Sequence, residues 1–153
     1  MTVVVDCGCA DWGESTSIER LISRFRPEHL YGFDPYPHYS ERQYVFDGCT
    51  VATVRSAAWV SNGSIPWVND TTRSHPASET EEHDAMVGCF DLAHFIDEFD
   101  EPVVLKLDVE GAEHVLIPHL IATGAIENVR LLLVEFHGQY EGPSIPVPWE
   151  VWA

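Results

Sequence analysis

Apolar residues gather in five short runs that are spaced along the whole chain. The first run, Val3 to Val5, is continuous rather than alternating, which is typical of a strand in a parallel sheet that is covered on both faces. Pro35 stops the second run, because proline cannot donate to a strand ladder. The pattern predicts five strands, at residues 3–5, 30–35, 50–54, 103–108 and 129–137.

Apolar residues at spacings of three and four positions predict helices between these strands. The first helix is expected to start at a cap, Ser15 or Thr16, and to end before Pro27. Asp91 is expected to cap a second helix, which ends before Pro102. A third helix is predicted over residues 109–124, interrupted at Pro118 and ended by Gly124. Strand, helix and strand in succession predict right-handed crossovers in an α/β fold with a mostly parallel sheet.

Three further segments carry weaker patterns. Asn62 and Gly63 lie between two apolar runs and predict a β-hairpin. Residues 69–86 are polar and acidic without a period, which predicts a loop, either a plain excursion or a lid. The proline-rich residues 138–153 are expected to add an edge strand or a covering arm. We find no repeat, so residues 1–153 are expected to form a single domain.

The composition is that of a globular protein, with 45% hydrophobic and 22% charged residues, but the net charge is −17. Such a chain has no basic surface with which to displace counterions from nucleic acid, and an anionic membrane would repel it. No targeting segment is visible at the N-terminus, and the longest apolar run cannot span a bilayer. The four cysteines form no C-x-x-C motif, so we expect reduced thiols and a cytoplasmic protein.

The first strand leads into the stretch "DCGCADWGES", which has the outline of a nucleotide-binding turn. Its two glycines are spaced too widely for the dinucleotide motif G-x-G-x-x-G. In the phosphate-loop alignment Glu14 stands where the lysine should be, and Asp11 adds a second acid. Carboxylates at a helix N-terminus compete with a phosphate for the free amides. A phosphate-free nucleoside with a positive centre suits this turn better.

S-adenosylmethionine is such a ligand, since it joins an adenosine to a sulfonium cation. Its ribose requires an acceptor for two hydroxyls, and Asp34 ends the second strand about 20 residues after Gly13, the spacing typical of ribose-binding acids. The sequence therefore predicts S-adenosylmethionine as the cofactor.

Four stretches in this order resemble the motifs of FkbM-type methyltransferases, a family of the class I S-adenosylmethionine-dependent superfamily. The resemblance runs from Val3 to His137, and its most specific part is "KLDVEGAE", Lys106 to Glu113. It implies a Rossmann-like fold with helices on both faces of the sheet, and O-methylation of a hydroxyl on a small molecule or sugar. The four stretches are "VVVDCGCADWGES", "YGFDP", "VVLKLDVEGAEHVL" and "LLLVEFH".

By position, the resemblance implies that Asp6, Gly8 and Gly13 form the cofactor turn and that Asp34 holds the ribose. Asp108 is implied to contact the methionine end or the acceptor. The chain departs from the superfamily in two respects. An acidic residue near the adenine has no counterpart in "RSAAWV", and the fold is expected to be trimmed after the fifth strand. The exposed sheet edge would then suit a partner subunit, as in a homo-oligomer.

Acids and histidines cluster after the fourth and fifth strands, where parallel neighbours would bring them to one crevice. A hydroxyl acceptor must lose its proton, and His137 is a reasonable base. Asp108 or Glu110 could serve instead. Glu113 is expected to cap the following helix, and Lys106 to pair with an acid because a lone buried cation is costly. The cluster comprises Asp108, Glu110, Glu113, His114, Glu135 and His137.

Two other functions compete with methyl transfer. In a metal-dependent hydrolase, Asp34, Asp108, Glu110 and His137 would hold a hard cation. That hypothesis leaves the glycine turn unexplained, and the sequence contains no compact metal motif. The methyltransferase interpretation assigns no metal ligand. A non-catalytic module that binds S-adenosylmethionine or a nucleoside without transferring a methyl group is the third alternative.

Overall fold

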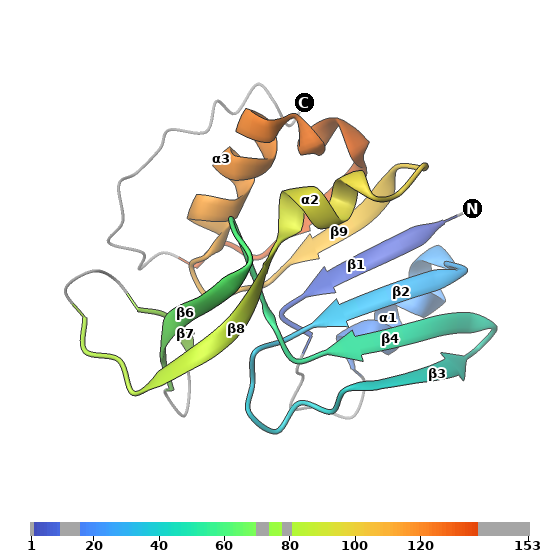
Figure 1. Cartoon of the computed structure of the whole chain (residues 1–153). Helices are drawn as coiled ribbons and strands as arrows, with labels where there is room; N and C mark the ends of the chain where they lie inside the picture. Colours follow the sequence, from blue (N-terminus) through green and yellow to red (C-terminus); the bar gives the residue numbers. More distant parts are fainter. Residues whose placement is uncertain (1, 10–15, 70–73, 78–80, 138–153) are drawn as a thin grey trace.

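The computed structural model describes residues 2–9, 16–69, 74–77 and 81–137. In this part of the chain ten strands form two sheets, accompanied by three α-helices and one 3-10 helix (Figure 1). The helices are α1 (Ser17–Phe25), α2 (Leu92–Asp97), α3 (Glu113–Thr123) and the 3-10 helix η1 (Ala125–Asn128). Among the described residues, no helix combines the length and apolar character that crossing a membrane requires.

The larger sheet has six strands in the order β10-β9-β1-β2-β4-β3. Neighbours from β10 to β4 are parallel, and β3 is antiparallel to β4. The two central strands are therefore β1 and β2, and the first strand of the chain lies between β9 and β2. The strands are β1 (Val3–Cys7), β2 (His29–Phe33), β3 (Arg42–Phe46), β4 (Cys49–Val54), β9 (Val103–Leu107) and β10 (Val129–Val134).

The two faces of this sheet are covered by different helices. Val3, Val5 and Cys7 of β1 pack in one core with α2 and α3, whereas Val4 packs in another core with α1. All five residues of β1 are buried, as a strand covered on both faces requires. Figure 1 shows α2 and α3 together on one side of the sheet and α1 behind it. The apolar stripe from which α1 was predicted faces the sheet.

A smaller sheet is formed by the segment between β4 and α2, in the order β5-β8-β6-β7. The central strand β8 is parallel to β5 and antiparallel to β6. Its core is small and includes Ile65, Trp67 and Cys89. The strands are β5 (Ala57–Trp59), β6 (Gly63–Val68), β7 (His75–Pro76) and β8 (Ala85–Asp91).

The predicted fold class, a Rossmann-like and mostly parallel sheet trimmed after the fifth strand, is wrong. The chain has a mixed α/β architecture that is rich in strands, with antiparallel pairs in both sheets. Two segments cause the difference. Between β2 and β4 the chain forms the edge strand β3 rather than a crossover helix, and residues 57–91 build the second sheet.

Several individual elements were predicted correctly. The five predicted strands correspond to β1, β2, β4, β9 and β10, although their bounds differ by a few residues. Thr16 is the N-cap of α1, and its hydroxyl accepts from the Glu19 amide at 3.2 Å. Asp91 caps α2, and Gly124 ends α3 in a left-handed conformation.

Two local predictions are wrong. The apolar runs that flank Asn62-Gly63 do not pair as a hairpin, because β8 lies between β5 and β6 and pairs with both. Helix α3 is not interrupted at Pro118. A proline removes one helical hydrogen bond, but Leu116, Ile117 and Leu120 are fully buried, so tertiary packing holds the helix through it.

The predicted loop at residues 69–86 is partly strand, since it contains β7 and the start of β8. Residues 70–73 and 78–80 lie outside the described residues, as do the predicted arm at 138–153 and part of the first turn. Strand β8 could have been recognised from its alternation, because Ala85, Val87 and Cys89 face the small core. Strand β3 is mostly exposed, so burial gives no pattern for it, but the dipeptide Asp47-Gly48 that joins it to β4 is a strong hairpin signal.

Asp91 joins the small sheet to the larger one, because it ends β8 and caps α2. Its Oδ1 accepts from the Ala93 and His94 amides at 3.0 and 3.3 Å, and from His119 Nε2 of α3 at 3.0 Å. Burial alone would raise the pKa of the Asp91 carboxyl, but the hydrogen bonds from His119 and from the two amides outweigh it, and the net pKa is lowered.

We predict that Asp91→Ala lowers the free energy of unfolding by about 1–2 kcal/mol at pH 7, as for the loss of a helix cap. Since the pKa is lowered on folding, the stabilisation is present above the unfolded value of about 3.9 and is lost as the pH falls through the folded value. Urea unfolding at pH 7 and pH 3 measures this effect, and the difference between the two proteins should shrink at pH 3. Asp100→Ala, at an exposed site, should change stability by less than about 0.5 kcal/mol at either pH.

Candidate functional site

Four backbone hydrogen bonds align the carboxyl ends of the parallel strands into one edge. In each of them the first residue after a strand donates its amide to the last residue of the neighbouring strand. The side chains that follow these strands are therefore presented side by side. The pairs are Gly8 to Phe33 (2.8 Å), Asp34 to Val54 (3.2 Å), Asp108 to Cys7 (3.0 Å) and Glu135 to Leu107 (2.9 Å).

Gly8 allows the chain to leave β1 at this edge. Its φ is +85°, and a Cβ added there would lie 1.7 Å from the carbonyl oxygen of Asp108. No residue with a side chain fits at that distance, so the close approach of the turn to the start of the β9–α3 connection requires glycine. Gly13, the second glycine of the predicted turn, lies outside the described residues, as do Asp11 and Glu14.

The carboxylate of Asp6 is fully buried beneath this turn. Its Oδ2 accepts from the Ser17 hydroxyl of α1 at 2.5 Å, and its Oδ1 accepts from Lys106 Nζ of β9 at 3.0 Å. Lys106 also donates to the Gly8 carbonyl at 3.2 Å and lies 3.6 Å from Asp108. The expected pairing of Lys106 with an acid is confirmed. Since both oxygens of Asp6 are engaged, this residue can act on a ligand only by holding the turn.

The charges of this network also affect the pKa of the two nearby thiols, Cys7 and Cys9. Burial, together with the negative charges of Asp6 and Asp34, raises the pKa of Cys7 and of Cys9. All four cysteines are free and buried. Because nucleophilic attack and metal binding both require the thiolate, these two residues are poor candidates for either role.

His137 lies at the centre of the acidic cluster over β9 and β10. Its Nδ1 is 2.5 Å from Glu113 Oε1, and Glu113 is fully buried in the first turn of α3. Its Nε2 faces three more carboxylates, from Asp108 at 3.7 Å, Glu110 at 3.6 Å and Glu135 at 3.8 Å. Ligand atoms of Asp108, Glu110 and His137 all lie within 4.8 Å of one another.

The acids around His137 change its proton affinity. Burial alone would lower the pKa of the imidazole, but the hydrogen bond and charge of Glu113, followed by the charges of Glu110 and Asp108, outweigh it and raise the pKa above its ordinary value. A positive charge is therefore stabilised at this point of the edge, whether it is carried by the ring or by a ligand.

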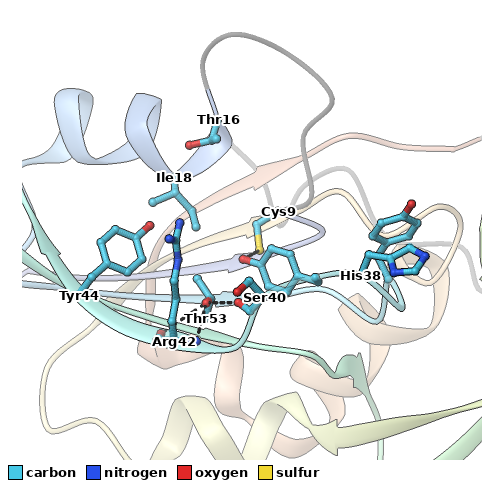
Figure 2. A pocket seen from close by; sticks show the side chains of 10 residues that line it. Cys9, Thr16, Ile18, His38, Ser40, Arg42, Tyr44 and Thr53 are labelled. Carbon is cyan, nitrogen blue, oxygen red and sulfur yellow. Dashed lines mark hydrogen bonds between the residues drawn. The ribbon is translucent and has the colours of Figure 1, made fainter.

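At the other end of the edge, a cavity of about 250 Å³ lies between α1, the segment after β2, and strands β3 and β4. Tyr36, Tyr39 and Tyr44 contribute aromatic walls, and the Arg42 guanidinium lies 4.5 Å from the Tyr44 ring centroid. Figure 2 shows Arg42 and Tyr44 beneath Ile18 of α1, and the hydroxyl of Thr53 hydrogen-bonded across the floor. Asp34 is tied to one of the lining residues, since its Oδ1 accepts from the Tyr36 amide at 2.8 Å.

The structure brings most of the predicted site residues to this edge. Asp6 lies one residue before the end of β1, and Gly8, Asp34 and Asp108 directly follow β1, β2 and β9, which are adjacent strands. Asp108 and Glu110 converge with His137. Asp34 belongs to the other end of the edge and does not join that group.

Two features of the site were not predicted. Glu113 is not a helix cap, because Ala112 occupies the cap position, and its carboxylate instead contacts His137. The aromatic cavity depends on β3, which was not expected, although the sequence "DPYPHYSERQY" at 34–44 places three tyrosines just after Asp34.

No family model matches the sequence, and no curated protein or solved structure matches it either.

We predict that the buried pair of Asp6 and Lys106 is strongly coupled. Asp6→Asn should lower the free energy of unfolding by about 3 kcal/mol, the low end for a buried pair because Lys106 keeps 20% of its side chain exposed. In a Lys106→Met background the same change should cost at least about 1.5 kcal/mol less, as measured by a double-mutant cycle in urea.

The exposed pair of Arg26 and Asp47, 3.7 Å apart, provides the control. A cycle with Arg26→Met and Asp47→Asn should give a coupling below about 0.5 kcal/mol, since solvent screens both groups. Equal coupling in the two cycles would contradict a special role for the buried pair.

Proposed function

We propose that the chain is an S-adenosylmethionine-dependent methyltransferase that methylates a hydroxyl of a small molecule or sugar. The observation that supports it best is the order of groups along the edge. Four features follow one another along it: the aromatic cavity at β4, Asp34 after β2, the Gly8 turn after β1, and the acidic cluster, which begins after β9. Ligands of open α/β sheets bind outside the carboxyl ends of the strands, where successive connections leave to opposite faces. Here α1 follows β1 on one face and α3 follows β9 on the other.

The cofactor would lie along the edge with its adenine in the aromatic cavity. A volume of about 250 Å³ is below the roughly 300–1,000 Å³ of pockets that enclose a whole small molecule, so it suits one ring system. Tyrosine rings provide stacking surfaces for a base. Asp34, two residues before Tyr36, would then accept from the ribose hydroxyls.

The charges favour the same orientation. Arg42 makes the cavity unsuitable for a sulfonium, whereas the acidic end of the edge attracts one. With the methionine end over β1 and β9, the methyl group would lie near Asp108. The acceptor would occupy the space above β9 and β10, among Asp108, Glu110 and His137.

Methyl transfer at this site would be an in-line displacement. The acceptor oxygen forms a bond to the methyl carbon, the carbon–sulfur bond breaks, and the sulfonium becomes the neutral thioether of S-adenosylhomocysteine. The hydroxyl proton passes to a base, for which His137, Asp108 and Glu110 are the candidates. Much of the rate would come from alignment of oxygen, carbon and sulfur.

Metal-dependent hydrolysis is a second candidate function, because three of its four expected ligands, Asp108, Glu110 and His137, come together. It gives no role to the Gly8 turn, to Asp34 or to the aromatic cavity. A chain that binds S-adenosylmethionine and releases S-adenosylhomocysteine only with an alcohol acceptor would exclude it.

We predict that isothermal titration calorimetry detects S-adenosylmethionine binding in EDTA. Asp34→Ala should weaken this binding by about 10- to 100-fold, which corresponds to the loss of hydrogen bonds to a charged group. Asp100→Ala, which removes an exposed acid elsewhere, should bind as the wild type does. The absence of heat with the wild type, or equal affinity in Asp34→Ala, would refute the proposed function.

We also predict that His137→Ala lowers turnover by at least about 100-fold, the lower range for general acid–base catalysis, while the Kd for S-adenosylmethionine changes less than about threefold. Release of S-adenosylhomocysteine over a panel of sugars and small alcohols measures turnover. An equal loss of affinity and turnover would remove His137 from the chemical step.

A further inference from the structure

The orientation of His137 leaves one ring nitrogen facing oxygen atoms that it does not hydrogen-bond. Glu113 holds Nδ1, so Nε2 is directed at the carboxylates of Asp108 and Glu110. Those separations, 3.7 and 3.6 Å, exceed the 2.7–3.2 Å of an ordinary hydrogen bond. Two ligand atoms about 2.1 Å from one ion, at a tetrahedral angle, lie about 3.4 Å apart. The spacing is close to that of ligands that share an ion.

We infer that Asp108, Glu110 and His137 bind a divalent transition-metal ion. Carboxylate oxygens suit Mg²⁺, Ca²⁺ and Mn²⁺, while an imidazole is a ligand for softer divalent ions. A mixed set of two carboxylates and one imidazole therefore favours a transition-metal ion such as Zn²⁺, Fe²⁺ or Mn²⁺ over Mg²⁺ or Ca²⁺, and Mn²⁺ is the member of this group that serves as a paramagnetic probe. Glu135, 3.8 Å from the same nitrogen and 69% exposed, is placed to reach the ion or a water bound to it.

Glu113 supplies an independent observation. It is fully buried, its Oε1 contacts His137, and its Oε2 has no hydrogen-bond partner among the described residues. A buried carboxylate needs compensating charge, and the one positive charge that a protonated His137 can carry is shared among four carboxylates. A divalent ion on the opposite ring nitrogen supplies that charge. A carboxylate behind a metal-bound histidine commonly fixes the ring and strengthens it as a ligand.

A role of this ion in methyl transfer rests on the proposed function, whereas the binding of the ion to the three residues does not. A bound cation lowers the pKa of a coordinated oxygen, so an acceptor hydroxyl on the ion would lose its proton to solvent more readily. His137 would then act as a ligand and not as the base. The acceptor class is narrowed to alcohols that can coordinate a metal, such as a sugar with neighbouring hydroxyls.

Mn²⁺ titration of the whole chain, followed by electron paramagnetic resonance in 0.3 M KCl, tests the inference. We expect one site, and in pulsed spectra a nitrogen coupling from a bound imidazole. The coupling should be absent in His137→Gln. Glu113→Gln should keep the fold and weaken Mn²⁺ binding by about 10- to 100-fold, as loss of a supporting carboxylate does.

A charge-matched control is essential, because a chain with a net charge of −17 attracts cations nonspecifically. Asp108→Asn with Glu110→Gln should abolish the site, whereas Asp97→Asn with Asp100→Asn, the same charge change at exposed positions, should leave it intact. Equal weakening in both double variants, or bound Mn²⁺ without nitrogen coupling, would overturn the metal site. Binding of S-adenosylmethionine in EDTA would still stand or fall separately.

Discussion

The edge of the larger sheet depends on the ion pair between Asp6 and Lys106. These residues are direct partners in the parallel register of β1 and β9, and Asp6 also binds Ser17 at the start of α1. Placing a carboxylate and an ammonium in the interior costs free energy unless their remaining bonding capacity is used. Here Ser17 and the Gly8 carbonyl use it. The same contacts fix the turn, the helix and the two strands relative to one another.

A gradient of charge along the edge follows from this arrangement. Over β3 and β4 the aromatic cavity carries a guanidinium, and over β9 and β10 four carboxylates surround one histidine. A ligand with one neutral aromatic end and one cationic end would be oriented by that gradient before any specific contact forms. The proposed binding of a sulfonium-bearing nucleoside depends on this electrostatic asymmetry more than on any single residue.

The sequence predicted the parallel strands well because each contains a short run rich in apolar or β-branched residues, and a run such as Val3 to Val5 needs no distant information. It also placed Asp34 and Asp108 at strand ends. It failed where long-range pairing decides the structure. Nothing near Asn62-Gly63 indicates that β8, more than 20 residues later, will separate its two flanking runs. Glu113 and His137 were expected at one crevice, but the role of Glu113 was misjudged, because a glutamate at the start of a helix favours a cap and its contact with His137 depends on the folded sheet.

The small sheet is a single excursion of the chain, which leaves β4 and returns at Asp91. The residues of the acidic edge come from other segments, on β1, β2, β9 and β10. Evolution could therefore lengthen, shorten or replace this excursion while the edge stays intact. The fold is therefore divided into one part whose length and surface can change and another whose strand ends keep the same side chains together.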